Sequence, residues 1–294
     1  MISLALASSR SKVLDYLELA KLRLVSLVLL STAVGFFLGS PGSPDIGVLG
    51  MVLLGTGLVA AGSMSLNQWM EREEDALMNR TASRPLPAMK LRPEEAFWFG
   101  TALAAGGMLV LCVGVNAISS LLASFTLFSY LLFYTPMKKS SSFCTLVGAV
   151  PGAVPPLIGW AAAARHLSLE AWIFFTILFL WQMPHFFAIA WFCRKDYAAA
   201  GFKMLSVEDP GGEKISRQIL FYTLALVPVS LLPSLVGLTG PFYLASALGA
   251  GGLFTLLALK GLGRIQDLAF PIFRGSILYL AFLLLCMVLD KKGF

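Results

Sequence analysis

Nine stretches of about twenty mostly apolar residues run through this sequence, and they decide what the chain can fold into. An α-helix needs about 20 apolar residues to cross the hydrocarbon layer of a membrane. Only 13% of the 294 residues are charged, whereas a soluble domain carries roughly 25%. We therefore expect an all-α, polytopic membrane protein that forms a single domain over residues 1–294. The expected spans are residues 22–38, 46–66, 96–115, 118–133, 144–164, 169–192, 219–238, 242–259 and 271–289.

The basic residues are unevenly divided between the two sides of these spans. Of the 22 Lys and Arg residues, all but Arg165, Lys291 and Lys292 fall on the side of the amino terminus. By the positive-inside rule that side is the cytoplasm, so residues 1–20 form a cytoplasmic segment. Charged residues interrupt those first positions, so we expect no signal peptide and a bacterial inner (plasma) membrane location. The net charge of +6 is an orientation signal, and no nucleic-acid partner is expected.

The second span continues directly into an acidic stretch. Asn67, Glu71 and Asp75 are spaced four residues apart, so on one helix they drift by only about 40° per step and share a face. Like charges at this spacing repel, and a divalent cation removes that cost, since carboxylate oxygens suit Mg²⁺. Arg80 and Arg84 follow, and Arg is matched to phosphate oxygens. The prolines directly after Arg84 are expected to break the helix. The pattern predicts half of a Mg²⁺–diphosphate site at the mouth of a membrane helix; the alternative is a solvated helix end.

Two further polar segments are expected at the same membrane face. Lys195 can neutralise diphosphate oxygens, and Asp196 can join the metal or orient that lysine. The alternative for this pair is an ordinary cluster of interfacial charges. Lys138 and Lys139 follow the fourth span, and paired lysines in that position are usually topology signals.

One histidine lies inside a predicted span. His185 is about eight residues from the cytoplasmic end of the sixth span, roughly 12 Å deep by helical rise. An ionisable group at that depth is a functional hypothesis by default, and it can ligate iron, relay a proton or hydrogen-bond a substrate. The alternative is a neutral histidine that bridges to a neighbouring helix beside a kink at Pro184.

The fifth span is expected to bend or unwind. It contains Pro151, Pro155 and Pro156 together with two glycines. Such a break inside a membrane is tolerated only where protein or a cavity satisfies the freed backbone groups.

Together these segments resemble the UbiA-type intramembrane prenyltransferases. The resemblance covers about residues 15–215 in ordered blocks, of which the first is Asn67, Glu71 and Asp75 followed by Arg80 and Arg84. The later blocks are Tyr134-Thr-Pro-Met-Lys138, Gly148-Ala-Val-Pro-Gly-Ala-Val-Pro-Pro-Leu-Ile-Gly-Trp160, Trp181-Gln-Met-Pro-His-Phe186 and Lys195-Asp-Tyr197. The Pro-Pro-Leu-Ile-Gly-Trp and Trp-Gln-x-Pro-His-Phe blocks indicate the branch of the family that farnesylates haem.

This resemblance implies nine transmembrane helices around a central cavity that opens to the cytoplasm. It implies transfer of the farnesyl group of farnesyl diphosphate to the vinyl group of haem B, which gives haem O and diphosphate, with Mg²⁺ as cofactor. The implied partners are farnesyl diphosphate, haem B and the lipid bilayer, and a downstream haem-modifying enzyme is left open. The implied site residues are, for catalysis, Asn67, Glu71, Asp75, Arg80 and Arg84, of which the first three also hold the metal; for the diphosphate, Lys138, Lys195, Asp196 and Tyr197; and for haem, His185 and Trp181.

The sequence departs from the family pattern in two places. The family usually has Asp where Glu71 stands, and the second loop offers Lys195 and Asp196 instead of the paired aspartates of the quinone-pathway enzymes. The second departure fits the haem branch. Two other functions remain open. One is prenylation of an aromatic quinone precursor by a member of the same family. The other is a transporter with broken helices and a midplane site.

Overall fold

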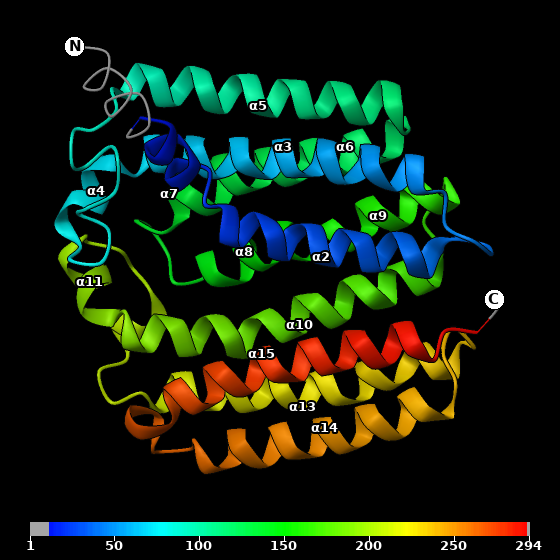
Figure 1. Ribbon diagram of the computed structural model, residues 1–294. Coiled ribbons are helices and arrows are strands. Elements are labelled where there is room, and N and C mark those ends of the chain that lie inside the picture. The colour runs from blue at the N-terminus through cyan, green and yellow to red at the C-terminus, as the bar shows by residue number, and fades with distance from the viewer. Residues whose placement is uncertain (1–11, 293–294) are drawn as a thin grey trace.

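The computed structural model describes residues 12–292 of the protein, and these residues form a bundle of roughly parallel and antiparallel helices (Figure 1). Nine helical segments in this range are long and apolar enough to cross a membrane. The only β-type pairing in the same range is an isolated bridge between Thr239 and Lys291. The expected all-α, nine-span architecture is therefore confirmed. Residues 1–11 of the expected amino-terminal segment lie outside the described residues.

The helices follow one another along the chain with short connections, and residues 12–19 form a helix before the first span. Their bounds are α2 (Leu22–Gly39), α3 (Ile46–Met70), α4 (Arg72–Leu77), α5 (Pro93–Gly114), α6 (Ala117–Phe128), the π-helix η1 (Ser129–Tyr134), α7 (Thr135–Met137), α8 (Cys144–Ala153), α9 (Pro155–Ala164), α10 (Leu169–Phe192), α11 (Arg194–Ala199), α12 (Leu205–Glu208), α13 (Glu213–Leu235), α14 (Pro241–Lys260) and α15 (Ile265–Leu289).

Several helices extend beyond the apolar runs that predicted them. Helix α13 begins at Glu213 rather than at residue 219, and Asp209 caps its start by accepting a hydrogen bond from Ile215 N at 3.0 Å. Helix α15 likewise begins at Ile265 rather than at residue 271. The reason is that an apolar run marks only the part of a helix that meets lipid or core, whereas the backbone hydrogen bonds continue into the polar ends.

The fifth span is broken as predicted, into α8 and α9 with Val154 between them. Side chains of neighbouring helices donate hydrogen bonds to backbone carbonyls along this broken span. These are Gln182 to Ala149 O (3.3 Å), Ser119 to Ile158 O (3.2 Å) and Asn116 to Ala161 O (2.8 Å). These bonds fasten the broken span to the start of α6 and to α10.

Helices α2 and α9 pack so closely that their backbones touch at two glycines. A Cβ on Gly159 would overlap Thr32 O of α2, and a Cβ on Gly35 would overlap Pro156 O of α9. Small residues at such crossings let helices approach in lipid, where dispersion contacts replace the hydrophobic effect as the main attraction.

The two ends of the bundle differ in chemistry. Helices α4 and α11 and the segment after α7 gather at one end, and the carboxyl terminus lies at the other end (Figure 1). The first end carries the acidic stretch and the polar loops that the sequence singled out.

Candidate functional site

Asn67, Glu71 and Asp75 lie together at the polar end of the bundle, and they are 2%, 6% and 1% exposed. Glu71 interrupts the helix, because it lies between α3 and α4. The helical spacing survives this interruption: Glu71 N donates to Asn67 O at 2.9 Å, and Asp75 N donates to Glu71 O at 2.8 Å. The three side chains keep the predicted shared face, and their burial contradicts the alternative of a solvated helix end.

The acidic helix ends earlier than expected. We expected Arg84 and the prolines after it to break the helix, but α4 ends at Leu77. Thr81 supplies the physical reason, because its hydroxyl donates to Asp75 O at 2.8 Å and so takes over a carbonyl at the end of the helix. The turns that follow bring Arg84 back to the acids, where its Nη1 lies 2.7 Å from Asp75 Oδ2.

Three cations contact the three predicted metal ligands. Arg84 pairs with Asp75, as just described. Lys138 Nζ donates to Glu71 Oε2 at 3.0 Å and lies 2.7 Å from Oε1, without hydrogen-bond geometry to that second oxygen. Burial opposes the lysine charge, but the Glu71 carboxylate together with Tyr130 and Tyr197 outweighs it, so the pKa of Lys138 is raised above its ordinary value. Lys138 is therefore part of the predicted site, while Lys139 pairs with Glu74 of the same acidic stretch.

Lys21 is the site residue that sequence reasoning missed. Its Nζ donates to Asn67 Oδ1 at 3.4 Å, and its backbone is left-handed, with φ of 51°. Burial, together with the charges of Arg84 and Lys138, lowers the pKa of Lys21 to about 7. In the sequence Lys21 is one of several lysines and arginines before the first span, and nothing local separates it from a topology signal. Only the packing of the residue 12–19 helix on α3, through Gln68 Nε2 to Leu19 O at 2.8 Å, brings it inside.

The carboxylates fit a divalent cation. Asp75 Oδ1 is buried and has no hydrogen-bond partner among the described residues, and an unsatisfied carboxylate oxygen is costly unless a cation or donor meets it. Asn67 and Glu71 place further oxygens on the same face. The part of the chain that the structure describes has no group of three or more His, Cys, Asp or Glu arranged to hold a metal. Two carboxylates with water and substrate phosphates are the usual Mg²⁺ environment.

The second predicted loop forms α11 beside this site, but its charges are used differently from the prediction. Asp196 Oδ1 accepts a hydrogen bond from Asn79 N at 3.2 Å, so it fastens α11 to the turn after α4 rather than orienting Lys195. Tyr197 is half-buried, and burial raises its pKa. Lys195 and Arg80 are exposed at the same end of the bundle, and among the described residues no hydrogen bond or ion pair joins them to Asn67, Glu71 or Asp75.

His185 and Trp181 lie apart from the acids, on the face of α10 that packs against α15. His185 Nδ1 is 2.8 Å from the hydroxyl of Ser276, and Trp181 Nε1 donates to Ser276 O at 2.6 Å. The two rings stack with centroids 5.0 Å apart. His185 therefore bridges to a neighbouring helix, as its alternative interpretation expected. Helix α10 continues through Pro184 without a break.

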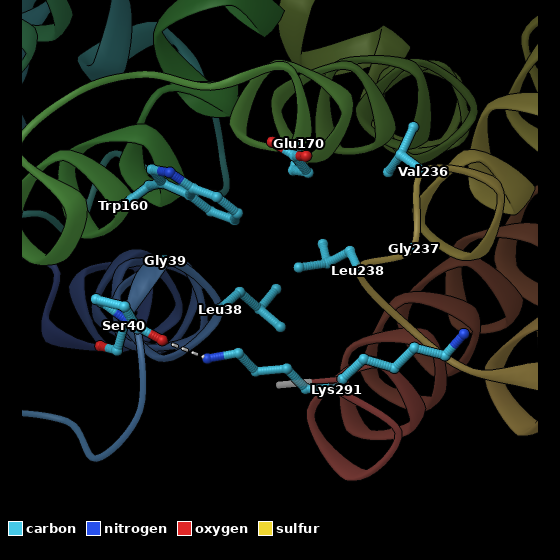
Figure 2. Close-up of a pocket in the computed structure, with 11 residues that line it drawn as sticks. Leu38, Gly39, Ser40, Trp160, Glu170, Val236, Gly237, Leu238 and Lys291 are labelled. Atoms are coloured by element: carbon cyan, nitrogen blue, oxygen red, sulfur yellow. Dashed lines mark hydrogen bonds between the residues drawn. The ribbon is translucent and has the colours of Figure 1, made fainter. Parts of the chain in front are cut away.

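A cavity of about 290 Å³ lies at the opposite end of the bundle (Figure 2). Lys291 lines it and donates to Phe37 O and Ser40 O, both at 2.7 Å, at the carboxyl end of α2. Trp160, Glu170 and Leu238 form other parts of its wall. Lys291 thus caps the carboxyl end of α2. The cavity is remote from the acidic site.

Known proteins resemble this chain in sequence and in fold. The sequence pattern of the UbiA prenyltransferase family matches residues 28–288 of this chain. The chain is 46% identical over 289 residues to the protoheme IX farnesyltransferase of Solibacter usitatus, with 95% of this chain and 99% of that one covered. It is 42% identical over 286 residues to the protoheme IX farnesyltransferase of Opitutus terrae, with 97% of each covered.

Two solved structures share the fold. The first concerns digeranylgeranylglyceryl phosphate synthase in membranes; it has a TM-score of 0.81 at 20% identity and covers 95% of this chain and 98% of that one. The second is a UbiA homolog from Archaeoglobus fulgidus bound to DMAPP and Mg²⁺; it has a TM-score of 0.67 at 16% identity and covers 93% and 99%.

Proposed function

This chain belongs to the UbiA prenyltransferase family, and from that premise we propose that it is a protohaem IX farnesyltransferase, a haem O synthase. It transfers the farnesyl group of farnesyl diphosphate to a vinyl group of haem B. The full-length relatives with that name support the substrate pair. The observation that carries the chemistry is the buried set of Asn67, Glu71 and Asp75 with cations against each of them.

The site is built to receive an anion. Three basic side chains, Lys21, Arg84 and Lys138, lie against the Asn67–Glu71–Asp75 face, which carries two carboxylates. Burial is the largest cause of the lowered pKa of Lys21, and the charges of Arg84 and Lys138 lower it further. A diphosphate group balances the surplus charge, and Arg is suited to bind phosphate oxygens in a bidentate way. We propose that Arg80, Lys195 and Tyr197 complete the diphosphate site, and that Asp196 supports it by holding α11 against the turn after α4.

Asn67, Glu71 and Asp75 are the residues that would hold Mg²⁺. When bound, the metal neutralises charge that develops on the departing diphosphate oxygens. Arg84 and Lys138 act on the same charge, and preorganised donors of this kind are usually the largest single contribution to catalysis. The relatives with this fold that bind DMAPP and Mg²⁺ support the assignment.

The reaction balances without a strong general base. The C–O bond between farnesyl and diphosphate breaks, and the allylic cation that forms is attacked by the haem vinyl group, which makes the new C–C bond. Water adds to the resulting cation and loses a proton, which leaves a hydroxyl. The apolar interior of the bundle keeps water from the allylic cation before the vinyl group reaches it.

The rival functions fit the observations less well. A quinone-precursor prenyltransferase shares the fold, but the full-length curated relatives cited above are protohaem enzymes. A transporter would use the broken fifth span, yet the acids lie at the end of the bundle and not at its middle. The central cavity and a downstream haem-modifying partner remain predictions.

We also propose that one domain spans residues 1–294, and that the bilayer surrounds the nine spans in a bacterial inner membrane. The end that carries α4 and α11 then faces the cytoplasm. Support comes from the gathering of the basic loops at that end, while the carboxyl terminus with Lys291 and Lys292 lies at the other (Figure 1).

Mass spectrometry of haem tests the function directly. The purified protein is incubated with haem B, farnesyl diphosphate and Mg²⁺, with 4-hydroxybenzoate present as a competing acceptor, and the haem is extracted. We expect farnesylated, hydroxylated haem that disappears when EDTA removes the metal. Unchanged haem together with a prenylated phenol would assign the chain to the quinone pathway, and no prenyl transfer at all would remove the enzyme proposal.

Replacing Lys21 with Met should weaken binding of farnesyl diphosphate. A hydrogen bond to a charged group contributes about 1.5–3 kcal/mol, so we expect KM for farnesyl diphosphate to rise about 10- to 100-fold at saturating haem. Lys12→Met is the matched control, because Lys12 lies in the short helix just before Lys21 but its side chain is 58% exposed and pairs with Glu95. An equal KM in the two variants would exclude Lys21 from the diphosphate site.

A further inference from the structure

One residue of α15, Ser276, contacts both of the side chains assigned to haem. It is fully buried. Its hydroxyl lies 2.8 Å from His185 Nδ1, and its backbone oxygen accepts from Trp181 Nε1 at 2.6 Å. Neither the sequence motifs nor the proposed diphosphate chemistry uses Ser276.

The serine hydroxyl has one proton, and the structure shows where that proton goes. Ser276 Oγ donates to Phe273 O at 2.6 Å, three residues earlier in α15. The same oxygen still has lone pairs for the imidazole. If Nδ1 of His185 carries the ring proton, both hydrogen bonds form. If Nδ1 has no proton, the ring N–H is on Nε2. The hydroxyl can then donate either to Phe273 O or to Nδ1, but not to both.

The surroundings of Nε2 decide between these two tautomers. Among the described residues, no group hydrogen-bonds to His185 Nε2. Trp181 and Phe273 pack against the ring with centroids 5.0 and 4.9 Å away, and neither offers an acceptor to Nε2. A proton on Nε2 would be an unpaired donor in apolar surroundings, which is costly. The neutral ring with its proton on Nδ1 makes every available hydrogen bond.

We propose that Ser276 is a positioning residue that holds neutral His185 as the Nδ1–H tautomer, so that Nε2 offers its lone pair to the iron of the substrate haem. A histidine that ligates a metal almost always donates its other ring N–H to an oxygen acceptor, which fixes the tautomer and the ring orientation. The His185–Ser276 pair has this form. The haem half of the proposal rests on the proposed function, whereas the tautomer half is a property of the protein alone.

Nitrogen NMR tests the tautomer without haem. The chain has only two histidines, so the full-length protein labelled with ¹⁵N-histidine gives two sets of ring signals, and His166→Gln assigns them. At neutral pH or above, we expect the His185 proton on Nδ1 in the wild type and a shift toward Nε2, the tautomer that histidine prefers in water, in Ser276→Ala. A wild-type ring that carries its proton on Nε2 would overturn the proposal.

Titration with haem B tests the second half. Removing an outer partner of a metal ligand typically costs 10- to 100-fold in affinity, so Ser276→Ala should bind haem B that much more weakly and with a shifted Soret band. Ser276→Thr keeps the hydroxyl and should restore the spectrum. Ser230→Ala is the matched control, because Ser230 is equally buried and its hydroxyl pairs with Tyr279 of the same helix α15.

The outcomes separate the two claims. A Ser276→Ala protein with unchanged haem affinity and spectrum would overturn the positioning role even if the tautomer is as expected. A wild-type protein with the Nδ1–H tautomer that makes no farnesylated haem would refute the proposed function and leave the tautomer assignment intact.

Discussion

Replacing Glu71 with Gln or Asp75 with Asn should reduce farnesyl transfer to haem by at least about a hundredfold, the scale on which single electrostatic groups act in catalysis. Each amide keeps the size of the side chain but removes the charge that a divalent cation requires. The loss should appear in the haem mass spectrum as a missing farnesylated product at saturating substrates.

Stability must be separated from catalysis in these variants. Both acids are buried in ion pairs, and removing one partner of a buried pair typically costs about 3–5 kcal/mol because a charge is left uncompensated. The double variant Glu71→Gln, Lys138→Met removes both charges, so it should regain thermal stability yet remain inactive. If activity returned together with stability, the carboxylate would be a structural group and the metal site would be wrong.

Glu73→Gln is the matched control for the acid variants. Glu73 lies in the same acidic stretch, but its side chain is 79% exposed and pairs with the neighbouring Arg72. Surface ion pairs of this kind contribute about 0–1 kcal/mol. The control should therefore keep full activity and full stability, which would show that burial at the site, and not acidity in general, is what matters.

Replacing Gly159 with Ala should destabilise the protein severely. The added Cβ would overlap Thr32 O of α2, and it would lie 2.7 Å from Phe36 N. These are backbone atoms, so no side chain can rotate away, and α2 must separate from α9. Overpacking of this kind typically costs about 1–3 kcal/mol or more. We expect a clear fall in the thermal unfolding temperature in detergent and a lower yield of folded protein.

Gly249→Ala is the control for this second prediction. Gly249 lies in helix α14, and nothing lies within 4 Å of the position of its missing Cβ. Alanine favours helix more than glycine does, so this variant should be neutral or slightly more stable. Equal behaviour of the two variants would mean that the close α2–α9 contact does not limit stability.

The sequence predicted the architecture well because membrane spans are encoded locally. Each span must satisfy its own backbone hydrogen bonds in lipid, so length and hydropathy alone identify it. The sixth span is residues 169–192 in both the expectation and the structure. The predicted break in the fifth span was also confirmed, because proline removes a backbone donor wherever it stands.

The acidic face was predictable for the same local reason. Asn67, Glu71 and Asp75 are within one short segment, and helical geometry fixes their relation regardless of what surrounds them. Their burial was not predictable, since neighbouring helices supply the cover. The early end of α4 was missed because Thr81, six residues beyond Asp75, caps it through a side-chain hydrogen bond.

Only the tertiary structure decided the contacts between segments that are far apart in the chain. Lys21 meets Asn67 across 46 positions, Lys138 meets Glu71 across 67, and Ser276 meets His185 across 91. A lysine before a membrane span looks the same in sequence whether it faces water or a buried carboxylate. The sequence by itself therefore determined the spans, their number and the acidic face, because these depend on neighbours along one helix. The packing of the helices determined which residue each charged side chain contacts, because burial and hydrogen-bond distance depend on which helices lie side by side.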